Sequence, residues 1–407
     1  MTASGTGGPW LSIVGIGEDG LEGLSAAARS LIGAAELVVG GKRHLQLVGD
    51  LARRTLAWSS PMEASVREVL AMRGRPVVVL ASGDPFNHGV GAILVRSQAP
   101  GEWLAFPQPS AFSLAANRLG WPLQETTTLG LNGRAIERLI PLLHPGARIL
   151  ALSADGATPA SVAKLLVDRG LGNAQLTVLE AMGGPRERTR AATAAALDFS
   201  DVDPLNVLAL EIGARPGVHS IPLTPGLPDD WFENDGQITK REVRALTLAS
   251  LAPRRGEHLW DIGCGSGSVA IEWMLSDPSC RATAIERHPE RAARAARNAL
   301  SLGVPGLSVE TGEANACLDR LDPPHAVFIG GGARQAGLVD RAWAALPAGG
   351  RLAINAVTLE TEALVLEQYR LKGGSLTRIS IDRADPIGSL KGWRPAMPVV
   401  HWLAVKP

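Results

Sequence analysis

Cysteines, net charge and long apolar runs are all scarce in this chain, and each shortage excludes a class of protein. The three cysteines, none in a C-x-x-C pair, are too few for a disulfide framework and fit a reducing compartment. Forty basic residues balance 40 acidic ones, so the positive surface typical of nucleic-acid-binding proteins is missing. No apolar run approaches the roughly 18 residues that span a bilayer, and residues 1–8 lack the features of a signal peptide. We therefore expect a cytoplasmic protein that binds neither nucleic acid nor a membrane.

Metal-binding patterns are missing as well. The eight histidines follow no H-x-x-x-H spacing and form no mixed pattern with the cysteines, so we expect no metal site. The 407 residues, 45% apolar and 20% charged, have the composition of an ordinary globular protein with two or three domains.

Short apolar runs alternate with helix-compatible segments along the whole sequence, a rhythm typical of α/β proteins with mainly parallel sheets. In the first half we expect helices at 25–35, 112–119 and 160–168, and strands at 11–14, 77–80, 149–152, 176–179 and 205–210. In the second half we expect strands at 259–262, 282–285, 307–310, 326–329 and 352–356. Two late runs, 376–381 and 399–405, have no full helix between them and predict a hairpin at the edge of the sheet.

The rhythm breaks at residues 214–228, where four prolines and two glycines oppose continuous helix or strand. This segment predicts a linker between a first domain at 9–213 and a second domain at 229–407. The two halves do not resemble each other in sequence, so we expect two different α/β domains.

A glycine-rich turn is the strongest chemical signal of the second half. Gly263-Cys264-Gly265-Ser266-Gly267 follows an expected strand, and its glycines allow a tight turn that brings backbone N–H groups close to a ligand. Glu286 ends the next expected strand, near the spacing from Asp261 at which a carboxylate accepts hydrogen bonds from both hydroxyls of a ribose. The turn lacks the full G-x-G-x-x-G form, which favours a mononucleoside cofactor over NAD.

Several of these residues also fit a purely structural role. The glycines would suit a turn that binds nothing. Cys264 is better explained as the small residue that the turn needs than as a nucleophile, since no histidine lies near it in the sequence. Thr239 begins the capping-box pattern Thr239-Lys240-Arg241-Glu242, so it is either the N-cap of a helix at 243–251 or a cofactor contact.

Two familiar patterns fail on position. Asp322-Pro323-Pro324-His325 looks like the D-P-P-Y signature of base methyltransferases, but it precedes the expected strand at 326–329, which Gly330-Gly331-Gly332 ends. Gly15-Ile16-Gly17-Glu18-Asp19-Gly20 matches G-x-G-x-x-G, but Glu36 precedes the apolar pair Val38-Val39 instead of ending a strand. These positions oppose a DNA methyltransferase and a dinucleotide site.

Three further turns of the first half, at 81–89, 109–113 and 180–187, carry a family resemblance. They contain Gly83-Asp84-Pro85, Ser113 and Met182, and in this order they resemble the tetrapyrrole (corrin/porphyrin) methylases, also called class III methyltransferases. The resemblance implies a two-lobed α/β domain that binds S-adenosylmethionine through Gly83, Asp84, Ser113 and Met182.

The second half resembles the class I S-adenosylmethionine-dependent methyltransferase fold, a Rossmann-like seven-stranded sheet with an antiparallel final strand. The resemblance implies a second cofactor site, and therefore two S-adenosylmethionine sites per chain. The residues that it places at this second site are Thr239, Gly263, Cys264, Gly265, Ser266, Gly267, Glu286 and Ala314.

The pairing of these two domains is similar to that of the decarboxylating corrin methyltransferases of aerobic cobalamin biosynthesis. The resemblance implies that the substrate is precorrin-6Y, methylated at C5 and C15 and decarboxylated at the acetate side chain on C12 to give precorrin-8. The alternatives are a two-domain methyltransferase acting on RNA or another small metabolite, and a non-catalytic scaffold.

No catalytic residue is assigned from the sequence. His88 is either an acid/base group or a loop histidine bonded to backbone, and four arginines are candidate partners for substrate carboxylates: Arg96, Arg118, Arg134 and Arg334. We also expect the chain to form a homo-oligomer.

Overall fold

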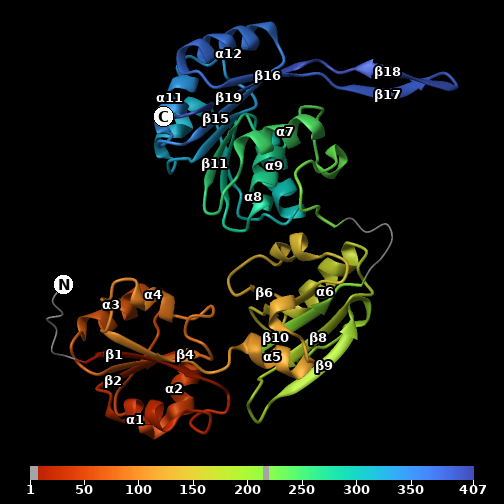
Figure 1. Cartoon of the computed structure of the whole chain (residues 1–407). Coiled ribbons are helices and arrows are strands. Elements are labelled where there is room, and N and C mark those ends of the chain that lie inside the picture. The colour runs from red at the N-terminus through yellow and green to blue at the C-terminus, as the bar shows by residue number, and fades with distance from the viewer. Residues whose placement is uncertain (1–7, 214–219) are drawn as a thin grey trace. The chain divides into compact units, whose positions relative to one another are not determined.

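The computed structural model describes residues 8–213 and 220–407 (Figure 1). They form two compact units, one made of 8–136 with 144–213 and the other of 137–143 with 220–407. Part of the expected linker, 214–219, lies outside the described residues, and the rest of it belongs to the second unit. None of the helices in the two described ranges is both long and apolar enough to cross a membrane.

The first sheet of the first unit is parallel throughout, in the strand order β3-β2-β4-β1-β5. Ser25 begins the first helix by accepting a hydrogen bond from the backbone N–H of Ala28, and this helix buries Ala28 and Ile32 against the sheet. The strands are Leu11–Ile16 (β1), Leu37–Gly40 (β2), Thr55–Ala57 (β3), Val77–Ser82 (β4) and Trp103–Phe106 (β5). The helices are Ala26–Ala34 (α1), Lys42–Val48 (α2), Glu63–Ala71 (α3) and Gly91–Val95 (α4).

Gly15 allows two neighbouring strands of this sheet to approach closely. Strands β1 and β4 are parallel neighbours, so the loops that follow them meet at one edge of the sheet. A Cβ atom on Gly15 would lie 1.8 Å from the backbone oxygen of Gly83, a distance that no side chain tolerates. Glu36 precedes β2, as the sequence indicated.

The second sheet of the first unit is mainly antiparallel, which corrects the expectation of parallel sheets in this half. Its order is β6-β7-β10-β8-β9, and only β6 and β7 are parallel. The last strand, β10, inserts between β7 and β8, and a short turn at 181–187 joins β8 to β9. The elements are Thr127–Gly130 (β6), Arg148–Leu152 (β7), Gln175–Glu180 (β8), Arg188–Thr193 (β9), Asn206–Glu211 (β10), Ala111–Leu119 (α5) and Thr158–Asp168 (α6).

The second unit contains a seven-stranded sheet in the order β13-β12-β11-β14-β15-β19-β16, in which β19 is antiparallel to both neighbours. This confirms the expected class I architecture and the edge hairpin. The strands are His258–Ile262 (β11), Arg281–Glu286 (β12), Ser308–Thr311 (β13), Ala326–Ile329 (β14), Arg351–Ala356 (β15), Ser375–Ile379 (β16) and Val399–Val405 (β19). The helices are Arg241–Leu251 (α7), Ser268–Ser276 (α8), Pro289–Ser301 (α9), Ala314–Cys317 (α10), Leu338–Ala345 (α11) and Leu359–Lys372 (α12).

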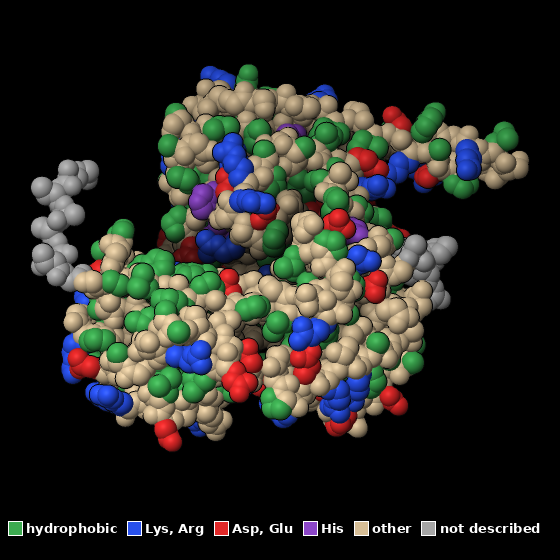
Figure 2. Space-filling model, turned by 60° about the horizontal axis from the view of Figure 1, so that its bottom comes forward, with side chains coloured by type: hydrophobic (Ala, Val, Ile, Leu, Met, Phe, Trp, Pro, Cys, Tyr) green, Lys and Arg blue, Asp and Glu red, His purple; other side chains and the backbone are tan. Residues whose placement is uncertain are grey.

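A two-stranded ribbon, Asp382–Ile387 (β17) and Leu390–Pro395 (β18), projects from the second unit (Figure 1). Hydrophobic and charged side chains are intermixed along this arm (Figure 2). Its apolar residues Leu390 and Trp393 are 74% and 75% exposed. Because neither face of the ribbon is buried, the sequence shows no two-residue apolar period there, and the ribbon was not predicted.

Candidate functional site

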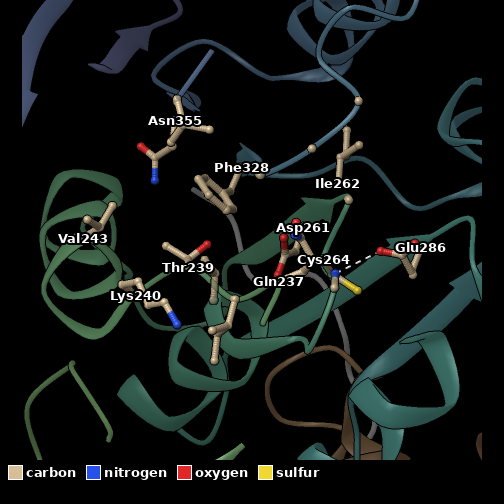
Figure 3. A pocket seen from close by; sticks show the side chains of 18 of the residues that line it. Gln237, Thr239, Lys240, Val243, Asp261, Ile262, Cys264, Glu286, Phe328 and Asn355 are labelled. Carbon is tan, nitrogen blue, oxygen red and sulfur yellow. Dashed lines mark hydrogen bonds between the residues drawn. The ribbon is translucent and has the colours of Figure 1, made fainter. Parts of the chain in front are cut away.

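A cavity of about 560 Å³ lies in the second unit where the parallel strands β11, β12, β14 and β15 end (Figure 3). The carboxyl ends of neighbouring parallel strands meet at one edge of a sheet, which is where open α/β sheets bind ligands. The glycine turn after β11 and Glu286 at the end of β12 form one part of its wall. The segment 236–240 before α7 forms another.

The glycine turn has the backbone geometry that its sequence predicts. Gly263, Gly265 and Gly267 have φ angles of +68°, +56° and +76°, in the left-handed region that glycine adopts without strain. A Cβ atom on Gly263 would lie 2.7 Å from the backbone oxygen of Gly331, so the loops after β11 and β14 touch through backbone alone. Asp322 precedes β14, and Gly330-Gly331-Gly332 follows it. The structure therefore confirms that the Asp322-Pro323-Pro324 pattern does not end this strand, as it would in a DNA methyltransferase.

Glu286 is buried, and its carboxylate is held in one orientation. Its Oε2 accepts a hydrogen bond from the backbone N–H of Gly265 at 3.0 Å, and its Oε1 accepts one from the backbone N–H of His288 at 3.0 Å. Each carboxylate oxygen has a further lone pair. The side chain therefore presents two fixed acceptors at the cavity, which suits a pair of vicinal hydroxyls.

Asp261 carries an unpaired carboxylate oxygen at the same cavity. Its Oδ2 accepts a hydrogen bond from the backbone N–H of Ala270 at 3.0 Å, but its Oδ1 is buried and has no partner among the described residues. Burial raises the pKa of Asp261 from its ordinary 3.8 to about 7, the bond from Ala270 opposes the rise, and the charge of Glu286 adds to it. A ligand with a cationic donor would satisfy this oxygen.

The cavity brings together six of the eight residues that the sequence placed at this site: Thr239, Gly263, Cys264, Gly265, Glu286 and Ala314. The other two do not line it. The carbonyl of Ser266 accepts a hydrogen bond from Asn298, and Gly267 begins α8 against Ala295. Burial raises the pKa of the Cys264 thiol well above its ordinary value, so this cysteine stays protonated and is a poor nucleophile.

Of the two roles considered for Thr239, the structure contradicts the N-cap. Helix α7 begins at Arg241, its N-cap is Lys240, and no side chain caps it. The carbonyl of Thr239 instead accepts a hydrogen bond of 2.6 Å from Arg244 Nη1. The backbone N–H of Arg244 donates to the carbonyl of Lys240 at 2.8 Å, so the helix starts one residue later than the pattern indicates, and Thr239 lines the cavity.

The far end of this cavity, where Asn355, Arg383 and Met397 lie, was not assigned from the sequence. Of these three, only Asn355 could have been identified from the sequence. It is a polar residue in the apolar strand β15, one position before the strand's carboxyl end, where ligands bind in such sheets. Arg383 lies in the ribbon and Met397 just after it, and the ribbon has no periodic pattern.

A second cavity, of about 370 Å³, lies between the two sheets of the first unit. It is lined by Gly83 and Met182, two of the four residues expected at the first cofactor site. Asp84 and Ser113 are outside its lining. Asp84 Oδ1 accepts a hydrogen bond from the backbone N–H of Phe86, and the Ser113 hydroxyl contacts that of Ser110 at 3.0 Å.

Two histidines line this second cavity. Burial, and then the charge of Arg43, lower the pKa of His44 to about 4, so its ring is neutral at pH 7. His44 Nε2 lies 2.8 Å from Ser82 Oγ and 3.0 Å from Arg43 Nη2. Because an arginine nitrogen can only donate, His44 Nε2 accepts the hydrogen bond from Arg43. His88 packs edge-on against Phe112, with ring centroids 5.7 Å apart, so its ring contacts an apolar neighbour.

The four arginines proposed as carboxylate partners line neither cavity. Arg118 is held by Glu187 through two hydrogen bonds of 2.7 and 3.0 Å. Its guanidinium is therefore committed to the turn at 181–187.

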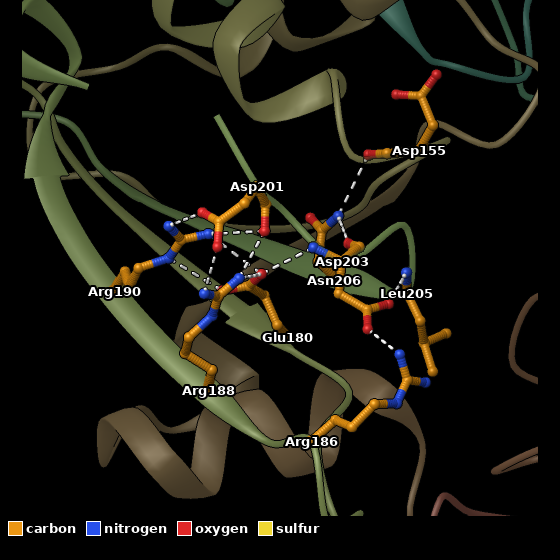
Figure 4. A network of polar contacts seen from close by, with 9 residues as sticks. All are labelled: Asp155, Glu180, Arg186, Arg188, Arg190, Asp201, Asp203, Leu205 and Asn206. Carbon is orange, nitrogen blue, oxygen red and sulfur yellow. Dashed lines mark hydrogen bonds and ion pairs between the residues drawn. The ribbon is translucent and has the colours of Figure 1, made fainter. Parts of the chain in front are cut away.

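Beside the second cavity, a network of charged groups fixes that turn (Figure 4). The fully buried carboxylate of Glu180 accepts two hydrogen bonds from each of Arg188 and Arg190 and one from the backbone N–H of Asp203. Asp201 pairs with the same two arginines. Burial raises the pKa of Glu180, but these hydrogen bonds outweigh burial, so its pKa is lowered overall.

Replacing Glu180 with glutamine should destabilise the first unit by about 1–3 kcal/mol, because a neutral amide cannot accept from both arginine forks. Cofactor affinity at the expected first site should fall too, since the turn that carries Met182 begins directly after Glu180. Chemical denaturation and titration with S-adenosylhomocysteine measure the two effects. Glu211→Gln, at an exposed position of β10, is the control. Unchanged stability would mean that the network does not hold the turn.

The raised pKa of Asp261 predicts a pH effect on the ligand-free protein. Between about pH 4 and 7 the folded state holds a proton that the unfolded state has released, so this group's stabilisation is lost as the pH rises to 7. Asp261→Asn removes the group. The difference in unfolding free energy between wild type and variant should therefore change with pH in this window, whereas Asp382→Asn, at an exposed position, should show no such change. A constant difference would contradict the prediction.

Comparison with known proteins adds to this geometry. Residues 11–198 match the family model of tetrapyrrole (corrin/porphyrin) methylases, and residues 230–406 match that of the precorrin methyltransferase domain. A solved structure titled as the C-terminal domain of precorrin-6Y C5,15-methyltransferase from Rhodobacter capsulatus is 45% identical. It covers 46% of this chain and 100% of that chain, with a TM-score of 0.44.

Curated relatives match over nearly the whole length. The chain is 54% identical over 395 residues to precorrin-6Y C(5,15)-methyltransferase (decarboxylating) of a Sinorhizobium species, covering 97% of this chain and 96% of the relative. It is 40% identical over 401 residues to the protein of that name from Mycobacterium tuberculosis H37Rv, covering 97% and 99%. The chain therefore belongs to the family of decarboxylating precorrin-6Y C5,15-methyltransferases.

Proposed function

We propose that this chain methylates precorrin-6Y at C5 and C15 and removes carbon dioxide from the acetate side chain on C12, giving precorrin-8 in aerobic cobalamin biosynthesis. The observation that carries the proposal is the cavity of the second unit. There a glycine turn, two fixed acceptors on Glu286 and the unpaired Oδ1 of Asp261 surround one space at the carboxyl ends of parallel strands. Full-length similarity to relatives that carry this activity in their names supports the same conclusion.

We further propose two S-adenosylmethionine sites per chain, one in each unit. At the second site Glu286 would hold the ribose hydroxyls and Asp261 the amino group, while the glycine turn approaches the cofactor through backbone. The residues that we propose for this site are Thr239, Gly263, Cys264, Gly265, Ser266, Gly267, Glu286 and Ala314, and those for the first are Gly83, Asp84, Ser113 and Met182. Ser266, Gly267, Asp84 and Ser113 would act through the loops that they hold, since they lie outside the cavity linings.

The bound cofactor supplies an electrophilic methyl group on sulfur. The reduced macrocycle is an enamine-like nucleophile at its meso carbons, so the chain needs chiefly to orient the two reactants and exclude water. The cavity of the second unit fits that task, because its residues offer fixed acceptors and no ionised cysteine.

We assign the decarboxylation and one of the two methylations to the second unit. The domains that we propose are 9–213 and 229–407, joined by a linker at 214–228. The precorrin methyltransferase match at 230–406 supports this division. The low cysteine content favours a cytoplasmic location for the protein. We also propose that the chain forms a homo-oligomer.

Mass spectrometry of the product tests the function. Incubation of the full chain with precorrin-6Y and S-adenosylmethionine should yield a product that has gained two methyl groups and lost one carbon dioxide. Omission of the cofactor is the control. A product with one methyl group and no loss of carbon dioxide, or no conversion at all, would contradict the proposal.

A further inference from the structure

The cavity of the second unit has a far end that none of the proposed cofactor contacts reaches. The residues that line it there include the apolar Ile379, Met397 and Val399 and the polar Asn355 and Arg383. An apolar surface with few polar groups suits a flat conjugated ring that carries acidic side chains.

The amide of Asn355 is held in one orientation by its neighbours. Thr247 Oγ1 donates its only hydrogen to the carbonyl of Val243 at 2.8 Å, so it must accept from the group 2.9 Å away on Asn355. That group is therefore the NH₂ of the amide, and the amide oxygen faces His401.

This orientation also fixes the tautomer of His401. The ring Nδ1 lies 2.7 Å from Asn355 Oδ1, which can only accept, so Nδ1 carries the hydrogen. His401 is buried, and burial lowers its pKa, which keeps the ring neutral at pH 7. Asn355 is thus clamped from two sides by neutral groups on α7 and β19.

Each clamping bond leaves Asn355 with capacity for a ligand. Thr247 takes one of the two NH₂ hydrogens and His401 occupies one of the two lone pairs of the oxygen. Asn355 is only partly buried and its amide lies at the cavity, on the side of Phe328 and Val243 (Figure 3). The second N–H is then a fixed, neutral donor for a molecule in the far end.

Two cations that line the cavity, Lys240 and Arg383, already have anionic partners. Lys240 Nζ lies 3.8 Å from Asp229 Oδ2. Arg383 forms an ion pair with Glu242 of α7. A carboxylate that binds beside Asn355 therefore meets a neutral amide donor, and both nearby cations are already paired. Loss of carbon dioxide moves the negative charge from the carboxylate into the ring system, so a cation on the carboxylate would stabilise the reactant more than the transition state.

We propose that Asn355 binds the carboxylate of the acetate side chain that is lost as carbon dioxide, and that Thr247 and His401 are positioning residues for it. This inference rests on the proposed function. In the reaction the bond between the methylene and carboxyl carbons breaks and its electron pair enters the macrocycle. Carbon dioxide leaves, and the methylene carbon takes a proton that comes ultimately from water.

The test compares full-length wild type with Asn355→Leu, Asn355→Asp and His401→Leu in two measurements. One is the conversion of precorrin-6Y, with kcat and KM determined for loss of carbon dioxide. The other is the binding of precorrin-6Y in the presence of S-adenosylhomocysteine, which requires no turnover. Binding of S-adenosylhomocysteine alone reports on the cofactor end. Asn117→Leu, at an exposed asparagine of the first unit, is the matched control.

We expect Asn355→Leu to lower kcat/KM for decarboxylation by about 10- to 100-fold, the loss usual for a hydrogen bond to a charged group, with cofactor affinity unchanged. Asn355→Asp should weaken precorrin-6Y binding by more than about 10-fold through like-charge repulsion, and His401→Leu should lower kcat/KM by about 3- to 10-fold. Normal decarboxylation by Asn355→Leu, or an equal loss of cofactor binding, would overturn the inference.

Failure of the proposed function has a different signature. If wild type binds precorrin-6Y without converting it, the proposed function is wrong, and the binding series alone decides the role of Asn355. If wild type neither binds nor converts it, both proposals fall.

Discussion

Replacing Arg244 with methionine is expected to lower the unfolding free energy of the second unit by about 3–5 kcal/mol, the cost usual for breaking a buried ion pair. Arg244 is fully buried, and its Nε donates to Glu272 Oε1 at 2.6 Å. Its other nitrogens donate to Asp229 and to the carbonyls of Leu227 and Thr239. The variant leaves the buried Glu272 carboxylate without its cation. Chemical denaturation followed by tryptophan fluorescence measures the loss.

Arg241→Met is the matched control, because Arg241 is an exposed arginine in the same helix. Its effect should stay within about 0.5 kcal/mol. A similar loss in both variants would show that the change of helix surface, and not the buried pair, sets the cost.

The same cluster bears on where an isolated second unit must begin. Glu272 also accepts hydrogen bonds from the backbone N–H groups of Gly226 and Leu227, at 2.6 and 3.0 Å. A fragment that begins at the proposed domain start, 229, lacks both donors, whereas one that begins at 220 keeps them. We therefore expect the longer fragment to be the more stable of the two.

Wild type should bind two molecules of S-adenosylhomocysteine per chain, and Glu286→Gln should weaken binding at one of the two sites by at least about 100-fold. Glutamine has a single amide oxygen, so it cannot serve the backbone of Gly265 and His288 and both ribose hydroxyls as the carboxylate does. Isothermal titration calorimetry measures both sites in one experiment, and the unaffected site of the first unit is the internal standard.

Glu290→Gln, at an exposed glutamate four residues further on, is the control variant and should leave both sites intact. One cofactor per chain, with all binding lost in Glu286→Gln, would refute the two-site proposal.

The sequence predicted the elements that form the core, because buried strands keep an apolar pattern whatever surrounds them. Strands β4, β11 and β14 were predicted in this way, within two residues of their bounds, and so was the glycine turn, since its positive φ angles need glycine. Strand β9 was missed because its exposed positions include Arg188, which serves Glu180.

The parts of the site that escaped prediction depend on partners distant in the chain. Thr239 has the local pattern of an N-cap but does not cap α7. Its carbonyl accepts from Arg244, which is held by Glu272, 28 positions further along the chain. Asn355 and His401 lie 46 positions apart and meet only because β15 and β19 pair. Such pairings follow from sheet topology, which a single sequence does not specify residue by residue.

The ribbon of β17 and β18 should be among the parts of the second unit whose backbone hydrogen bonds break most readily. Neither strand pairs with any third strand among the described residues, and a lone two-stranded ribbon is only marginally stable in water. Its backbone amides should therefore exchange hydrogen for deuterium far sooner than those of β19, which is paired on both sides. Slow exchange in the ribbon would reveal that another surface covers it in solution.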